Sequence, residues 1–311
     1  MRIREVDAST APDEELLALH TLEEACAPPG EPFRPPELSL AYHRHSTADV
    51  RRHFFADEDG ALIGAAVITV HGPAFVYVDL TVSPQHRRQG IATALLAELR
   101  SAAREVGASS FFSHYWSEDG AAFAAKIGAR DDQRDVRATL DLRSADLPEP
   151  SVPAGWRLLT WIGAAPDDLL ESYARCRDAM GDAPDPAGVE WPTVTVKDVR
   201  EIEQTAAKRG REMRVTVAID DRNEVAAFTD LRVTPGATMA STDDTAVAAW
   251  ARERGLGRAV KLESLRRLCA DRPEVKTVTT MNAERNAAMR HINTRIGFVP
   301  TVILTSTVLT L

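Results

Sequence analysis

Apolar and polar residues follow two kinds of pattern along the first half of the chain. Period-two or β-branched runs predict strands at Arg2 to Val6, His53 to Ala56, Ala61 to Val70, Phe75 to Val82, Ser109 to Tyr115 and Val136 to Leu142. Apolar residues three or four positions apart predict helices at Pro12 to Glu24, Leu38 to Val50, Thr93 to Glu105 and Gly120 to Ile127. The predicted order is β, α, α, β, β, β, α, β, α, β.

The same order of elements is predicted again in the second half. Strands are expected at Trp156 to Trp161, Met213 to Ile219, Val225 to Val233, a run that ends at Val247, Val275 to Met281 and Val299 to Leu311, the last as one or two strands. Helices are expected near Asp167 to Asp178, Val196 to Lys208, Arg258 to Leu268 and Ala283 to Ile296. The pattern therefore predicts an α/β protein built from an internal repeat.

The segment between the two halves has the composition of a linker. It contains Pro148, Pro150 and Pro153, and proline favours extended or turn structure over a helix interior. We therefore expect two domains, residues 1–143 and 156–311, joined by residues 144–155. A chain of 311 residues is long enough for two such units, each with its own core.

The composition and charge of the chain argue against some classes of function. Hydrophobic content of 44% and charged content of 27% are typical of a folded globular protein. The 37 basic residues are outnumbered by 46 acidic ones, giving a net charge of -9, which argues against a nucleic-acid binder that neutralises phosphates. The acidic balance is compatible with a cationic substrate such as an amine.

Neither a secretory nor a membrane-bound location is expected. The start of the chain lacks the apolar core of a signal peptide, and no apolar run of about 18 residues could span a bilayer. Cys26, Cys176 and Cys269 are scattered, which fits reduced thiols in the cytoplasm. His43 and His45 lack further ligands at metal spacing, so no metal site is predicted. The protein is expected to be a monomer or homodimer without a membrane or nucleic-acid partner.

One short motif occurs twice at the same place in the repeat. RRQGIA begins at Arg87, and RERGLG begins at Arg252, the equivalent point of the second half. Each copy follows a strand that ends in valine, Val82 or Val247, and each precedes a predicted helix. The exposed N–H groups at a helix N-terminus bind anions, and glycine lets a ligand approach the main chain. A pyrophosphate group would suit both loops.

In this context the sequence resembles the GNAT acetyltransferase superfamily, whose signature is a strand, a [QR]xxGx[GA] loop and a helix. The resemblance implies two tandem GNAT acyl-CoA N-acyltransferase domains, each with a mixed sheet splayed between its fourth and fifth strands. It also implies acetyl-CoA as co-substrate, with the acetyl group aligned by the two valines. The residues assigned to cofactor binding are Val82, Arg87, Arg88, Gln89, Gly90, Ile91, Ala92, Thr93, Val247, Arg252, Arg254, Gly255, Leu256, Gly257, Arg258 and Asn286.

A later motif of the superfamily is only partly present. In NAERNAAMRHINTRIGF, Asn286, Gly297 and Phe298 match, but Asn293 stands where a tyrosine usually serves as general acid. The first half departs further, with Ser117 and Ala124 at the corresponding positions. The tandem arrangement is similar to mycothiol synthase and to actinobacterial small-molecule acetyltransferases, so the C-terminal half is favoured for catalysis. Cofactor binding at both loops stays open.

The candidate catalytic residues are Asp79, Asp244 and Asn293. Asp79 and Asp244 lie three positions before the two valines, where a carboxylate could bind or deprotonate an amine; a turn cap or a solvated strand end is the alternative. Asn282, Asn286 and Asn293 form a polar group that could instead be ordinary surface. His114, Tyr115 and Trp116 could line a substrate pocket or pack at its rim. His291 is a weaker candidate for proton transfer.

The predicted function is therefore acetyl transfer from acetyl-CoA to a primary amine of a small molecule by direct attack. One domain could be degenerate. Two alternatives remain at this level: a tandem pseudoenzyme that binds or senses acetyl-CoA without turnover, and an N-acetyltransferase that acts on a protein or peptide.

Overall fold

The computed structural model describes residues 1–28, 33–45, 48, 50–70, 76–182 and 193–311. The order of major elements in each half is the predicted one, with short 3₁₀ turns η1 to η3 added. We expect two variable loops, from Pro28 to Ser46 and from Gly181 to Thr195, to determine the acceptor, and parts of both lie outside the described residues. The first residue of the strand predicted at Phe75 to Val82 also lies outside them.

The chain forms two compact units. Unit 1 consists of residues 1–133 and 304–311, and unit 2 consists of residues 134–303. We call them the N-terminal unit and the C-terminal unit. In the part of the chain that the structure describes, no helix is long and apolar enough to cross a membrane.

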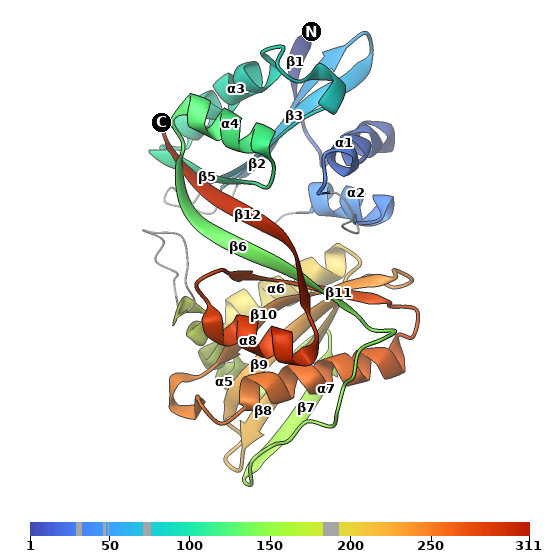
Figure 1. Cartoon of the computed structure of the whole chain (residues 1–311), viewed down its shortest axis with the longest axis vertical. Helices are drawn as coiled ribbons and strands as arrows, with labels where there is room; N and C mark the ends of the chain where they lie inside the picture. The colour runs from blue at the N-terminus through green and yellow to red at the C-terminus, as the bar shows by residue number, and fades with distance from the viewer. Residues whose placement is uncertain (29–32, 46–47, 49, 71–75, 183–192) are drawn as a thin grey trace. The chain divides into compact units, whose positions relative to one another are not determined.

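The N-terminal unit contains a mixed sheet in the order β1-β2-β3-β4-β5-β12. The strands and helices of this half are β1 (Arg2–Val6), α1 (Asp13–Ala25), α2 (Pro36–Arg44), β2 (Val50–Glu58), β3 (Ala61–Val70), β4 (Val76–Val82), η1 (Pro84–His86), α3 (Ile91–Glu105), β5 (Ser110–Tyr115), α4 (Glu118–Ile127) and β6 (Arg130–Asp141). Helix α3 buries Leu95 and Leu99 against one face, and α1 buries Leu16 and Leu19 against the other (Figure 1).

The C-terminal unit contains strands in the order β6-β11-β10-β9-β8-β7. The elements of this half are β7 (Trp156–Ile162), α5 (Asp167–Arg177), η2 (Asp178–Asp182), α6 (Val196–Lys208), β8 (Glu212–Asp220), β9 (Val225–Val233), β10 (Met239–Val247), η3 (Ala249–Ala251), α7 (Leu256–Asp271), β11 (Thr277–Ala283), α8 (Ala287–Ile296) and β12 (Val299–Thr310). Its core combines α5 and α6 with β8 and β9 in one cluster and α7 with β9 in another.

The two halves exchange their last strands. Strand β6 pairs with β11 of the C-terminal unit, from Asp135 with Ala283 to Asp141 with Thr277. Strand β12 pairs with β5 of the N-terminal unit, from Thr305 with Tyr115 to Thr310 with Ser110. The compact units therefore do not coincide with the predicted division into residues 1–143, 144–155 and 156–311. Local patterns predict a strand but cannot tell which half supplies its partner.

Two predicted helix boundaries are wrong. The last helix was expected from Ala283, but this residue ends β11 and α8 begins at Ala287. The second helix was expected over Leu38 to Val50, but α2 ends at Arg44, and Val50 is the first residue of β2. Val50 pairs with Val70 in the ladder between β2 and β3, so the strand is longer than the predicted His53 to Ala56. Val50 is part of a strand because it pairs with Val70. Pairing with a neighbouring strand overrides the local sequence pattern at this position.

Each sheet opens between its two parallel central strands. In the N-terminal unit, the register of β4 with β5 is limited to Tyr77 with Phe112. In the C-terminal unit, β10 and β11 pair from Met239 with Thr277 to Thr242 with Thr280, and the remainder of β10 up to Val247 has no register partner in β11. The splay between the fourth and fifth strands that the resemblance implied is therefore present in both units.

Candidate functional site

The two motif loops have the same backbone conformation. Arg88 and Gly90 adopt φ of 64° and 86°, and their counterparts in the second copy, Glu253 and Gly255, adopt 64° and 77°. Gly90 and Gly255 are the N-cap residues of α3 and α7, and neither helix has a side-chain cap. A left-handed residue followed by an uncapped helix start leaves several N–H groups available for an anion. The sequence repeat is thus also a repeat of loop geometry.

In the N-terminal unit this loop borders a cavity of about 920 Å³. The cavity is lined by residues from the end of α1, the splayed end of β4, the loop, the end of β5 and helix α4. The lining residues include Cys26, Leu80, Thr81, Val82, Arg87, Arg88, Gly90, Ile91, Ala92, Thr93, His114, Tyr115, Trp116, Phe123 and Lys126. His114, Tyr115 and Trp116, for which pocket lining and packing were both open, are among the residues that line this cavity.

This cavity fits a CoA thioester. Its volume is in the range of small-molecule and cofactor sites. A Cβ atom built on Gly90 would meet no atom within 4 Å, so the main chain of the loop is open to an approaching ligand. Arg87, Arg88 and Lys126 place positive charge around the loop and the neighbouring α4. The loop therefore offers main-chain donors and cations to a pyrophosphate, while Leu80 to Val82 offer a strand edge beside it.

Cys26 and Arg87 both contact the carbonyl oxygen of Val82. The Cys26 Sγ and the Arg87 Nε each lie 3.4 Å from it. Burial raises the pKa of the Cys26 thiol, so this thiol is protonated at neutral pH. Because the thiolate is the nucleophilic form of cysteine, the site does not favour a covalent acyl-cysteine step.

Asp79, Tyr77 and His114 come together at the mouth of the splay. Tyr77 and Asp79 are two positions apart on β4, and His114 is two positions after Phe112, the register partner of Tyr77, on β5. Alternation along a strand places each pair on one face of the sheet. Tyr77 Oη forms a hydrogen bond with His114 Nδ1, and their rings stack with centroids 5.7 Å apart.

Burial raises the pKa of Asp79, and the neighbouring His114 opposes that increase. Glu23, at the end of α1, also acts on Asp79 electrostatically. The Glu23 carboxylate accepts hydrogen bonds from Arg34 and lies 3.3 Å from Nε2 of the buried His43. His43 Nδ1 is 3.1 Å from Nε2 of His53. The carboxylate of Glu23, which acts on Asp79, is therefore compensated by Arg34.

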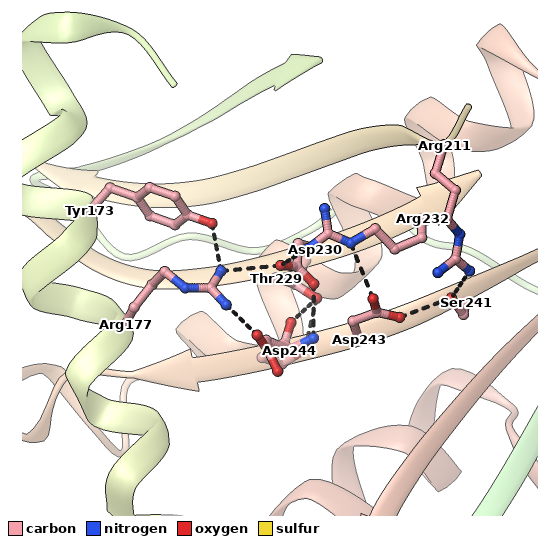
Figure 2. A network of polar contacts seen from close by, with 10 residues as sticks. Tyr173, Arg177, Arg211, Thr229, Asp230, Arg232, Ser241, Asp243 and Asp244 are labelled. Carbon is pink, nitrogen blue, oxygen red and sulfur yellow. Dashed lines mark hydrogen bonds and ion pairs between the residues drawn. The ribbon is translucent and has the colours of Figure 1, made fainter. Parts of the chain in front are cut away.

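Asp244, the counterpart of Asp79, lies in a different environment. Figure 2 shows it in a network of charged side chains on α5, β9 and β10. Arg177 donates to Asp244, to Asp230 at 3.1 Å and to Tyr173 Oη at 2.9 Å. Asp230 is fully buried and Arg177 is only 6% exposed, so the guanidinium is held between two carboxylates inside the unit. Burial, followed by the proximity of Asp230, raises the pKa of Asp244 to about 6.

The C-terminal loop makes contacts like those of the N-terminal loop, where Arg87 pairs with Asp119 and its Nε donates to the carbonyl of Val82. Arg252 forms an ion pair with Asp182, and its Nε donates to the carbonyl of Val247 at 3.2 Å. A Cβ atom on Gly257 would lie 3.2 Å from Val247 Cγ2 and 3.4 Å from Ile292 Cδ1. The strand end, the loop and α8 are therefore close-packed around Gly257.

The asparagine candidates of α8 hold the local structure together. Asn286 is the N-cap of α8 and accepts a hydrogen bond from the Met289 N–H at 3.2 Å. Asn293 is 4% exposed, and its Nδ2 donates to Asn282 Oδ1 at 2.6 Å. An asparagine amide does not supply a proton as a tyrosine hydroxyl does, so a catalytic role for Asn293 stays a prediction without support from these contacts.

A buried lysine on α7 gives a prediction for the C-terminal unit. Lys261 is 2% exposed, and its Nζ lies 5.5 Å from the centroid of the Phe298 ring. Burial lowers its pKa to about 7, below the ordinary lysine value. Between these two pKa values the unfolded chain binds more protons than the folded chain, so stability rises with pH.

We expect the free energy of unfolding to increase from pH 7 to pH 10 by up to about 1.4 kcal/mol per pH unit. Lys261→Met should remove most of this increase, whereas Lys197→Met, at an exposed position, should keep it. Urea unfolding of the three proteins across this pH range measures the effect. An unchanged slope in Lys261→Met would contradict the assignment.

Two contributors to the sites were missed by sequence reasoning. Tyr77 is two positions before Asp79, and the period-two pattern of β4 could have placed both on one face. Arg177 ends the predicted helix of the second half, but its partners Asp230 and Asp244 lie far along the chain, on β9 and β10. No local signal indicates such a pairing. In the described residues, no group of three or more His, Cys, Asp or Glu side chains could hold a metal ion.

A sheet that opens between two parallel strands lies beside an uncapped helix with a glycine loop in the N-terminal half of the chain. Residues 16–128 match the model of the Acetyltransferase (GNAT) family, so this stretch is similar to a GNAT acetyltransferase domain. The family model covers most of the N-terminal half, the half that contains the large cavity.

Comparisons over longer stretches agree with this assignment. The chain is 29% identical over 252 residues to a mycothiol acetyltransferase of Nocardia farcinica, covering 80% of each chain. It is 32% identical over 183 residues to a mycothiol acetyltransferase of Saccharomonospora viridis, covering 56% of each. The solved structure of a tandem GNAT protein from the clavulanic acid biosynthesis pathway superposes with a TM-score of 0.85 at 25% identity, covering 99% of this chain and 98% of that one.

Proposed function

We propose that the protein transfers the acetyl group of acetyl-CoA to a primary amine of a small molecule, and that the transfer takes place in the N-terminal unit. The observation that carries this proposal is the contrast between Asp79 and Asp244. Asp79 directly precedes Leu80, which lines the cavity beside the anion loop, and it interacts electrostatically with the cavity residue His114, whereas Asp244 is already paired with the guanidinium of Arg177. The C-terminal half, favoured from the sequence, is thus the less suitable acceptor site.

The cofactor fits the N-terminal loop. Main-chain N–H groups around Gly90, with Arg87 and Arg88, would hold the pyrophosphate, and the strand edge at Leu80 to Val82 would hold the pantetheine arm. Acetyl-CoA supplies an activated acetyl group as a thioester. The cysteine, the carboxylates and the loop of this chain supply no strong nucleophile, so direct attack by the amine is the reaction that the site supports.

The residues around the splay would prepare the amine. The carboxyl group of Asp79 would hold an ammonium group at the end of the cavity. Burial raises its pKa, a neighbouring ammonium would lower it again, and Glu23, which acts on it electrostatically, is compensated by Arg34. Trp116 and Tyr115 would form the wall on which an acceptor rests. Positioning of the amine beside the thioester is then the main source of rate acceleration.

A small-molecule acceptor is supported by the relatives, which are named mycothiol acetyltransferases. The experiment is incubation of the protein with acetyl-CoA and a panel of small amines, with CoA thiol release as the readout. Turnover with at least one small amine is expected. Thermal stabilisation by acetyl-CoA without thiol release across a broad panel would support a pseudoenzyme instead, and release with peptide amines alone would support a peptide acetyltransferase.

A further inference from the structure

The N-terminal unit lacks the tyrosine that commonly serves as a proton donor on its fourth helix, because Ala124 stands there. Its cavity nevertheless contains titratable groups. His114 lines the cavity, and its Nδ1 is bound to the hydroxyl of Tyr77. The His114 ring lies between two aromatic neighbours, with centroid distances of 5.7 Å to Tyr77 and 5.5 Å to Trp116. The orientation of this imidazole is therefore fixed from both sides.

We propose that His114 is the catalytic base that accepts the proton of the acceptor ammonium, and that Tyr77 is the positioning residue that orients it. The proposal rests on acetyl transfer in the N-terminal unit. In the tautomer in which Nδ1 carries the hydrogen and donates it to Tyr77 Oη, Nε2 is the basic nitrogen of the neutral ring. Asp79, on the neighbouring strand, holds the ammonium and then stabilises the imidazolium that forms.

The proton and electron balance of the step is complete. The ammonium gives one proton to His114 Nε2, and the freed nitrogen lone pair attacks the acetyl carbon. The new C–N bond forms as the C–S bond breaks, and the electron pair of the C–S bond leaves on sulfur. A second proton from the attacking nitrogen passes to this sulfur, giving the CoA thiol. His114 then returns its proton to water, so one proton is released per turnover.

The C-terminal unit provides an internal comparison. Thr242 is the counterpart of Tyr77 in the repeat, at the offset that relates Arg87 to Arg252, and its register partner on β11 is Thr280. Two positions after Thr280 stands Asn282, the counterpart of His114 by register. The pair Tyr77 and His114 is thus replaced by two residues that have no titratable group near neutral pH. The C-terminal unit, in which Asp244 is paired with Arg177, therefore lacks a counterpart of the dyad of Tyr77 and His114.

The substitution His114→Asn introduces asparagine, the residue type of its counterpart Asn282 in the C-terminal unit. We expect it to lower CoA thiol release at pH 7 by about 100-fold or more, while thermal stabilisation by acetyl-CoA is retained. The rate of CoA thiol release in Tyr77→Phe should lie between the rates of His114→Asn and the wild type. His291→Asn, the same change at an exposed position on α8, should have wild-type turnover.

The pH profile distinguishes a base from a structural residue. Wild-type kcat/KM should rise as His114 loses its proton and then level off. In His114→Asn this dependence should be absent, and kcat/KM should instead rise with the fraction of the amine that is unprotonated. The charged and titratable groups that surround the site and are common to both proteins are Tyr77, Asp79, Glu23, Arg34, Arg51, Arg87, Arg88, Asp119 and Lys126.

The outcomes separate the two proposals. Absence of wild-type thiol release with every amine would overturn the proposed function and the dyad together. Wild-type turnover with an unchanged rate and pH profile in His114→Asn would overturn the dyad alone. Loss of turnover in His114→Asn, with acetyl-CoA stabilisation retained and an intermediate rate in Tyr77→Phe, would support it.

Discussion

Replacing Gly90 by glutamate is expected to abolish both the thermal stabilisation by acetyl-CoA and the release of CoA thiol. Gly90 has φ of 86°, and its missing side chain leaves the loop open. A glutamate would place a carboxylate where the pyrophosphate is to bind. At a ligand concentration about 100 times Kd, the wild type should gain about 2.7 kcal/mol from acetyl-CoA, and Gly90→Glu should gain close to none.

Gly255→Glu is the matched control because Gly255 has φ of 77° at the same loop position. Backbone strain of about 1 kcal/mol or more is therefore common to both variants. Differential scanning fluorimetry with and without acetyl-CoA, followed by the thiol assay, should find ligand stabilisation and turnover retained in Gly255→Glu. The reverse pattern would assign the working loop to the C-terminal unit.

Replacing the carboxyl group of Asp79 by an amide is expected to cause the second large loss of catalytic activity. Asp79→Asn keeps the shape of the side chain but no longer holds an ammonium or stabilises an imidazolium. We expect kcat/KM to fall by about 100-fold to 10,000-fold, the range for loss of an acid–base group, while acetyl-CoA binding is unchanged. Steady-state thiol release with a saturating cofactor measures this loss.

Asp244→Asn serves as the counterpart in the C-terminal unit. It should leave turnover within a few-fold of wild type and should not lower stability at pH 7, because the raised pKa of Asp244, about 6, means that its negative charge costs stability in the folded chain, and Arg177 keeps Asp230 as a partner. Equilibrium unfolding in urea measures the stability. Strong loss of turnover in Asp244→Asn with full activity in Asp79→Asn would contradict the placement of the reaction.

Much of the fold is encoded in local patterns. The order of major elements in both halves, the helix Val196–Lys208 and the ends of β4 and β10 at Val82 and Val247 agree with periodicity and turn residues in the sequence. The motif loops, which repeat at a fixed offset in the sequence, also share a backbone geometry in the structure, with left-handed Gly90 and Gly255. Such features depend on neighbouring residues, which is why a single sequence is sufficient.

Features that depend on distant partners were not accessible in this way. The exchange of β6 and β12 depends on which strand edge is available, and no local pattern encodes that choice. The difference between Asp79 and Asp244, which look alike in sequence, comes from Arg177 at the end of α5 and from Tyr77 and His114 on separate strands. The sequence identified the two acids, but only their surroundings differentiate them.

A crystal structure of the protein with acetyl-CoA would show whether the cofactor binds and reacts in the N-terminal unit. We expect the pyrophosphate at Arg88 to Thr93, the pantetheine arm along Leu80 to Val82, and the acetyl group facing Asp79 and His114. A complex with acetyl-CoA bound only at Arg252 to Arg258, its acetyl group facing Asp244, would contradict this placement.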